Sequence, residues 1–108
     1  MSKNNTVKLV IFTPISHADL VRQALGEAGA GKVGHYDFCS FSSRGIGRFR
    51  GDQGTHPAIG EAGKHEEVEE ERIETTVPRS LLQHVLNSVK CVHPYEEIAY
   101  DIYPLESC

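Results

Sequence analysis

Hydrophobic residues in this chain fall into four short stretches that have the pattern of β-strands. The stretches are Thr6 to Thr13, His35 to Ser42, Arg72 to Val77 and Glu97 to Tyr103. The first is nearly continuously apolar from Leu9 to Phe12, which is typical of a central strand. The other three alternate between two sets of side chains, so each has two distinct faces.

Two further segments carry apolar residues at the spacing of an amphipathic helix. The first segment has Leu20, Val21, Ala24, Leu25 and Ala28, and the second has Leu81, Leu82, Val85, Leu86 and Val89. Both sets fall at i, i+1, i+4, i+5 and i+8, so each forms one helix face. Ser16 is predicted to cap the first helix, and Pro78 is predicted to begin the second.

The order of these elements is β-α-β-loop-β-α-β, which predicts an α+β fold of the ferredoxin-like βαββαβ type. We expect a four-stranded antiparallel sheet with both helices on one face, plus an extra glycine-rich hairpin or loop. The 108 residues suffice for one domain, 1–108. The second face of such a sheet is open, so its apolar side chains predict a homo-oligomer, either a dimer or a trimer.

Composition and charge exclude several classes of protein. The chain is 39% hydrophobic and 24% charged, as in soluble globular proteins. The net charge of −4 argues against binding to nucleic acid, and no apolar run is long enough to cross a membrane. The first residues lack the apolar core of a signal peptide, and the three cysteines form no CxxC pair. These features predict a cytoplasmic protein with reduced thiols.

The segment 43–64 is rich in glycine, which predicts a loop that is a candidate binding site. Six of the ten glycines lie between Gly45 and Gly63. Backbone N–H groups at glycines, together with Arg44, Arg48 and Arg50, are suited to an anion. The alternative is structural: a short hairpin through residues 46–50 that exposes its arginines, followed by an ordered loop. The glutamates that follow, from Glu66 to Glu71, have the pattern of a solvated face, and on an edge strand they would discourage aggregation.

The turn His93-Pro94-Tyr95-Glu96-Glu97 is the second candidate for chemistry. Pro94 restricts the backbone, so an imidazole, a phenol and a carboxylate are held at a rigid corner. His93 and Glu96 are therefore candidate ligands of a divalent metal ion, or an acid–base pair in a small enzyme. A thiol nucleophile at Cys39 is another enzymatic alternative. The structural alternative is a corner in which these side chains are packed or hydrogen-bonded to the backbone.

Five ordered segments resemble one known family. They are Gly31 to Phe41 (GKVGHYDFCSF), Gly45 to Arg50 (GIGRFR), Pro57 to Lys64 (PAIGEAGK), Glu69 to Pro78 (EEERIETTVP) and His93 to Pro104 (HPYEEIAYDIYP). Together they resemble the inserted domain of the Nif-three-like, or YqfO-type, dinuclear-metal-centre proteins. The resemblance implies a PII/CutA-like fold and an inter-subunit pocket. It implies no hydrolase activity here, because that family's metal centre lies in its flanking domain.

The function predicted from these features is a non-enzymatic binding module of regulatory type. It would take a small ligand, a metal ion or a protein partner, with a CutA-like divalent-metal protein as the alternative. The predicted ligand-binding residues are Tyr36, Ser40, Phe41, Gly45, Gly47, Arg50, Gly60, Gly63, Glu74, His93, Tyr95 and Glu96. Among them, His93 and Glu96 are the predicted metal ligands, and a divalent metal ion is the one cofactor considered.

Overall fold

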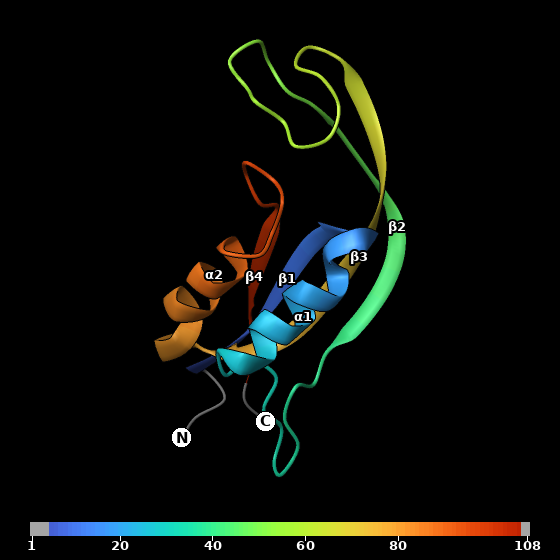
Figure 1. The fold of residues 1–108 in the computed structure, drawn as a ribbon. Coiled ribbons are helices and arrows are strands. Elements are labelled where there is room, and N and C mark those ends of the chain that lie inside the picture. Colours follow the sequence, from blue (N-terminus) through green and yellow to red (C-terminus); the bar gives the residue numbers. More distant parts are fainter. Residues whose placement is uncertain (1–4, 107–108) are drawn as a thin grey trace.

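Four strands form one antiparallel sheet, and two helices cover one of its faces (Figure 1). The computed structural model describes residues 5–106, so Cys108 and residues 1–4, on which the export prediction rests, lie outside the described residues. The strands are β1 (Thr6–Pro14), β2 (Phe41–Arg50), β3 (His65–Pro78) and β4 (Tyr100–Pro104). The helices are α1 (Ala18–Glu27) and α2 (Leu82–Lys90), each preceded by a short 3-10 turn, η2 (Ile15–His17) and η3 (Arg79–Leu81). The sheet order β2-β3-β1-β4 confirms the ferredoxin-like prediction.

The core lies between the sheet and the helices. Its fully buried members alternate along the strands and recur at helical spacing, as the hydrophobic pattern predicts. They are Val7, Leu9, Ile11, Ile73, Val77, Val21, Val85 and Val89. Leu20 is the exception on the first helix, because 53% of its surface is exposed. No helix within residues 5–106 has the length and apolar content needed to cross a membrane.

Strands β2 and β3 continue past the rest of the sheet as a two-stranded ribbon. β3 pairs with β2 from Glu74 to His65, but with β1 only as far as Glu70. The segment 65–69 therefore has β2 as its partner on one side only. A loop of residues 51–64 closes the ribbon and curves over the turn between α2 and β4 (Figure 1). The ribbon accounts for the elongated shape, 47 Å long and 23 Å across.

The predicted strand from His35 to Ser42 is wrong. Residues 35–40 form a loop, in which Tyr36 makes an isolated bridge to Val33, and β2 begins only at Phe41. The physical reason is the backbone: Gly34 and Phe38 have positive φ angles of 58° and 56°, which an extended strand does not accommodate. The aromatic alternation in this stretch therefore marks a turn.

The predicted hairpin through residues 46–50 is also wrong, and so is the extent of the glycine-rich loop. Residues 43–50 belong to β2 and pair with β3, so the loop covers 51–64 instead of 43–64. β3 itself begins at His65, seven residues before the predicted start at Arg72, because the glutamate run pairs with β2. From Glu66 to Glu69 the run pairs with β2 alone, so this part has one open edge, as the edge-strand interpretation expects. Glu70 and Glu71 pair on both sides and are buried, so the prediction of a solvated face is wrong for these two residues.

Three element boundaries also differ from the predictions. Ser16 does not cap α1: its hydroxyl is hydrogen-bonded to the His17 ring, and the α-helix starts at Ala18 after the 3-10 turn. Pro78 ends β3 instead of beginning α2. The last strand starts at Tyr100, three residues after the predicted start at Glu97.

Candidate functional site

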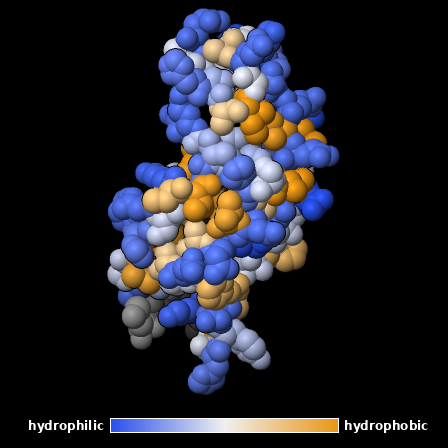
Figure 2. Space-filling view, viewed as in Figure 1, coloured by the Kyte–Doolittle hydropathy of each residue, from blue (hydrophilic) through white to orange (hydrophobic). Residues whose placement is uncertain are grey.

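A cleft of about 280 Å³ separates the ribbon and its loop from the α2–β4 turn. It is lined by Gly47, Arg48, Phe49, Arg50, Gly51, Thr55, Pro57, Ala58, Ile59, Glu70, Tyr95, Glu96, Glu97 and Ala99. The space-filling view shows hydrophobic surface at the waist beneath the mostly hydrophilic loop (Figure 2). The glycine-rich segment and the His-Pro-Tyr-Glu turn, which the sequence singles out separately, thus form opposite walls of one site.

The strand β2 presents glycines and one aromatic ring to the cleft. Side chains alternate along a strand, so Gly47, Phe49 and Gly51 share one face, and Arg48 and Arg50 belong to the other. Arg48 accordingly pairs with the exposed Glu67, with Nε 2.8 Å from Oε2. Both arginines are nevertheless among the residues that line the cleft. Alternation places their side chains on the strand face opposite to that of Phe49.

Tyr95 joins the turn to the ribbon. Its ring lies against Phe49, with the ring centroids 6.2 Å apart. Its hydroxyl donates a hydrogen bond of 2.7 Å to Oε2 of Glu70 on β3. Burial, followed by this hydrogen bond and the charge of Glu70, raises the pKa of Tyr95 far above its ordinary value of 10. The phenol therefore stays protonated and acts as a donor.

The Glu70 carboxylate occupies the space beside Gly47, where the neighbouring strand has no side chain. Only 9% of the surface of Glu70 is exposed. A Cβ atom at Gly47 would collide with the Glu70 carboxylate, so any other residue there would displace this carboxylate. The carboxylate is thus fixed between Gly47 and the Tyr95 hydroxyl and lines the cleft.

His93 is buried behind Tyr95 and both of its ring nitrogens are engaged. Nδ1 accepts a hydrogen bond of 3.1 Å from the backbone N–H of Tyr95, so Nε2 carries the proton and donates to the Phe12 carbonyl at 2.8 Å. Burial is the largest cause that lowers the pKa of His93 below 6.5, although the Phe12 carbonyl and Glu70 oppose it. His93 therefore acts as a neutral brace between β1 and the turn.

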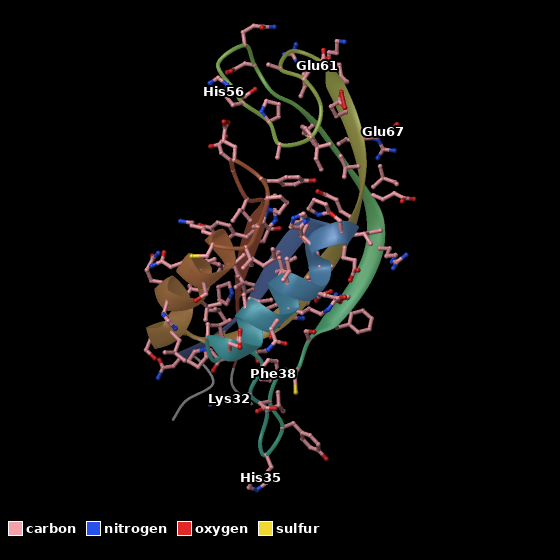
Figure 3. All side chains as sticks on the ribbon, viewed as in Figure 1. Lys32, His35, Phe38, His56, Glu61 and Glu67 are labelled. Atoms are coloured by element: carbon pink, nitrogen blue, oxygen red, sulfur yellow. The ribbon has the colours of Figure 1, made fainter. Side chains whose placement is uncertain are left out.

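Glu96 connects the turn to the loop. One of its carboxylate oxygens accepts a hydrogen bond of 3.0 Å from the backbone N–H of His56, and the other lies 3.5 Å from the same nitrogen. Figure 3 shows His56 on the loop that faces the turn. This hydrogen bond is exposed to solvent and links the turn to the loop beside the cleft.

The metal site predicted at His93 and Glu96 stays a prediction. Within residues 5–106, no three His, Cys, Asp or Glu side chains stand close enough together to hold a metal ion. In this conformation the two His93 nitrogens are bonded to the backbone, and Glu96 is bonded to His56.

The structure brings only some of the predicted ligand-binding residues together. Gly47, Arg50, Tyr95 and Glu96 line the cleft, and His93 supports it. The remaining predicted residues lie elsewhere: Gly45 in a smaller groove beside Arg72, Gly60 and Gly63 in the loop, Phe41 and Glu74 on the open sheet face, and Tyr36 and Ser40 in the loop before β2. Figure 3 places His35 and Phe38 of that loop at the opposite end of the molecule from His56.

Sequence reasoning missed several residues of the cleft, above all Glu70. Also missed as ligand-binding residues were Phe49, Ala58, Ile59, Glu97 and Ala99. The period-2 pattern of Ile73, Thr75 and Val77 can be extended backward as a strand through the glutamate run, but it places Glu71 on the buried face and Glu70 on the other. Opposite this run stand glycines of β2, since Gly45 pairs with Glu70 and Gly47 with Val68.

Curated proteins match this chain over nearly its whole length. The relative from Halalkalibacterium halodurans is 51% identical over 98 residues, and that from Bacillus subtilis is 50% identical over 99 residues; both are named GTP cyclohydrolase 1 type 2 homolog. The matches cover 91% and 92% of this chain but 26% of each relative. The chain therefore spans about a quarter of the length of these relatives. No family model matches the sequence.

Solved structures share the fold. A Bacillus cereus protein related to NIF3 superposes with a TM-score of 0.79 and 48% identity, covering 94% of this chain and 26% of that one. The divalent cation tolerance protein CutA from Archaeoglobus fulgidus has a TM-score of 0.70 at 18% identity, covering 95% and 86%. CutA from Synechococcus elongatus has a TM-score of 0.71 at 15% identity, covering 100% and 83%. At these low identities, the CutA structures establish the likeness of fold alone.

Proposed function

This chain is a homologue of the CutA-like segment of the NIF3-related proteins, and from that premise we propose that it is a non-enzymatic binding module of regulatory type. A small ligand occupies the cleft between the ribbon and the α2–β4 turn. The observation that carries the proposal is the cleft itself, which joins the glycine-rich segment to the His-Pro-Tyr-Glu turn. Small-molecule sites have this character: mostly apolar walls with a few convergent polar groups.

The positions of the candidate catalytic groups favour binding over catalysis. His93 Nε2 is committed to the Phe12 carbonyl, so it has no position from which to transfer a proton to a ligand in the cleft. Cys39 is fixed between Gly31 and Thr75 by backbone hydrogen bonds, near the end of the sheet where β2 begins. A nucleophile needs a base within hydrogen-bond reach, and the described contacts of the Cys39 thiol include only the Asp37 carbonyl.

The name of the relatives describes proteins about four times as long as this chain. The proposal assigns no cyclohydrolase activity to this chain, because the chain covers only 26% of each of these relatives. A cytoplasmic, homo-oligomeric module is part of the proposal. The support for the homo-oligomer is the open sheet face, where Phe41 is 68% exposed.

The proposal is tested by ligand screening with ¹⁵N-labelled protein. A panel of divalent metal ions, nucleotides and small metabolites is added, and backbone amide shifts are followed by NMR. We expect at least one compound to shift the amides of Phe49, Ala58 and Tyr95, which line the cleft. Ala58→Trp should fill the cleft and abolish the response.

Ala62→Trp is the matched control, because Ala62 belongs to the same loop but does not line the cleft. It should bind as the parent does. The proposal fails if no compound shifts the cleft amides, or if Ala58→Trp and Ala62→Trp respond alike.

A further inference from the structure

We propose that the ligand of this cleft is a small organic cation whose charged N–H group meets Glu70 and whose apolar body lies against Phe49 and Tyr95. The inference rests on the proposed function and specifies the chemical class of ligand. It follows from the unequal pairing of two neighbouring buried carboxylates.

Glu70 and Glu71 are consecutive, and both are at least nine-tenths buried, with exposed fractions of 9% and 7%. Glu71 has its cation: Arg22 Nη1 lies 2.5 Å from Oε1. Glu70 has no ion pair among the described residues 5–106, and its hydrogen-bond donor there is the neutral Tyr95 phenol. Carboxylates are seldom buried without an opposite charge, because the lost hydration is costly. A cation is therefore the missing partner of Glu70.

The position of Glu70 leaves one oxygen for that partner. Oε2 accepts from Tyr95, while Oε1 is the atom that a Cβ at Gly47 would strike. Gly47, Glu70 and Tyr95 all line the cleft. The second oxygen thus lies where a ligand in the cleft approaches the bare strand at Gly47, and a charge-assisted N–H bond there would be short and strong.

The charged residues around the cleft also favour a positively charged ligand. Glu96 and Glu97 line it together with Glu70. Arg48 pairs with Glu67 on the other face of the ribbon, and Figure 3 shows Glu67 on the outer side, away from the turn. Strand alternation places Arg50 on that face too. The lining thus holds three carboxylates, Glu70, Glu96 and Glu97, against two arginines, of which Arg48 is paired with Glu67, so the balance of charge favours a cation over an anion.

The remaining walls suit an organic cation better than a bare metal ion. Phe49 and Tyr95 present aromatic rings, which attract cations through their faces and cover an apolar body. A zinc site takes three or four protein ligands, and the described residues 5–106 supply no group of three His, Cys, Asp or Glu side chains. A volume of about 280 Å³ accommodates a compound with one ring.

Three probes of the same ring size and different charge test the inference: benzamidinium, neutral benzamide and anionic benzoate. Each is titrated into the ¹⁵N-labelled protein, with the amides of Phe49 and Tyr95 as reporters. We expect benzamidinium to bind at least about tenfold more tightly than benzamide, as for a hydrogen bond to a charged group. Benzoate should leave these amides unchanged.

Glu70→Gln should remove the preference for benzamidinium over benzamide, and Phe49→Leu should weaken both. Glutamine retains an acceptor for the Tyr95 hydroxyl, so the fold is expected to persist, and thermal unfolding verifies this. Glu67→Gln is the control: it lies on the same strand, is exposed and pairs with Arg48. It should leave all three affinities unchanged.

The outcomes separate this inference from the proposed function. If benzoate or benzamide binds as tightly as benzamidinium, or if Glu70→Gln keeps the preference, the cation inference is wrong while the cleft remains a binding site. If neither these probes nor the wider panel shifts the cleft amides, both proposals fail.

Discussion

Gly45 and Gly47 occupy the same face of β2, but their surroundings differ completely. A Cβ atom at Gly45 would meet nothing within 4 Å, whereas one at Gly47 would collide with the Glu70 carboxylate. The sequence motif contains both glycines, yet only Gly47 is required by a neighbouring side chain. At the scale of single residues, the cleft thus depends on what approaches each position from another strand.

Gly47→Ala is expected to displace Glu70 and break its hydrogen bond with Tyr95. The cost should be about 1 to 3 kcal/mol in the free energy of unfolding, since a buried polar group loses its partner. Urea denaturation followed by circular dichroism measures it. Gly45→Ala is the control and should be neutral or stabilising by up to about 1 kcal/mol, because a strand gains from losing a flexible glycine. Equal effects of the two variants would refute the steric role of Gly47.

At the scale of elements, α1 is tied to the β2–β3 pair by one arginine. Arg22 bonds Glu71 of β3 and Ser42 of β2, and it also pairs with Asp19 within the helix. The carboxylates raise the pKa of Arg22 further, mainly through the hydrogen bonds to Asp19 and Glu71. This connection lies next to the point where the ribbon leaves the sheet, because β3 pairs with β1 only as far as Glu70, the neighbour of Glu71.

Arg22→Met should destabilise the protein by about 2 kcal/mol, because Glu71 is left buried without its cation. The exposure of part of the Arg22 side chain, 30%, limits the effect. Urea denaturation checks this value.

Arg48→Met is the control: it breaks an exposed pair, in which both side chains are more than 60% exposed, and should cost less than about 1 kcal/mol.

In the double variant Arg22→Met/Glu71→Gln, part of the stability lost in Arg22→Met should return. A double variant that is less stable than Arg22→Met alone would contradict the role of the buried charge.

At the scale of the whole molecule, one sheet face is covered by helices and the other is not. On the open face, Phe41 is 68% exposed and Tyr103 is 41% exposed, while Arg72 stacks on Phe12 and approaches the Tyr103 hydroxyl. Exposed aromatic side chains on a sheet are unfavourable in water, which is the physical basis for expecting a further subunit there.

Phe41→Glu should convert the proposed oligomer into smaller species, since it places a charge on this open face. Sedimentation velocity at micromolar concentration measures the change. Ile46→Glu is the matched control: Ile46 is also an exposed apolar residue of β2, at 49%, but alternation places it on the opposite face. A parent protein that sediments as a monomer would rule out this part of the proposal.

Local periodicity was enough to predict the order of elements, the first strand and, apart from Leu20, the core faces of both helices. These features depend on local periodicity, because residues such as Val21, Leu25, Val85 and Val89 face the sheet wherever the helices pack. The sequence also marked Gly47 and Tyr95 as residues of a site. Local patterns carry this information, since a buried face repeats with the period of its own element.

The bounds of β2 and the burial of part of the glutamate run depend on long-range contacts instead. The backbone of Phe38 is left-handed, and its ring packs against Gly26. The strand β2 therefore starts later than the aromatic alternation suggests. The sequence predicts that Glu70 is solvated, but it is buried because β3 pairs with β2 and because Tyr95 packs over its carboxylate. These outcomes depend on contacts between residues far apart in the chain. The pattern of neighbouring residues does not encode the start of β2 or the burial of Glu70, because both depend on these distant contacts. The same contacts place Glu70 in the wall of the cleft.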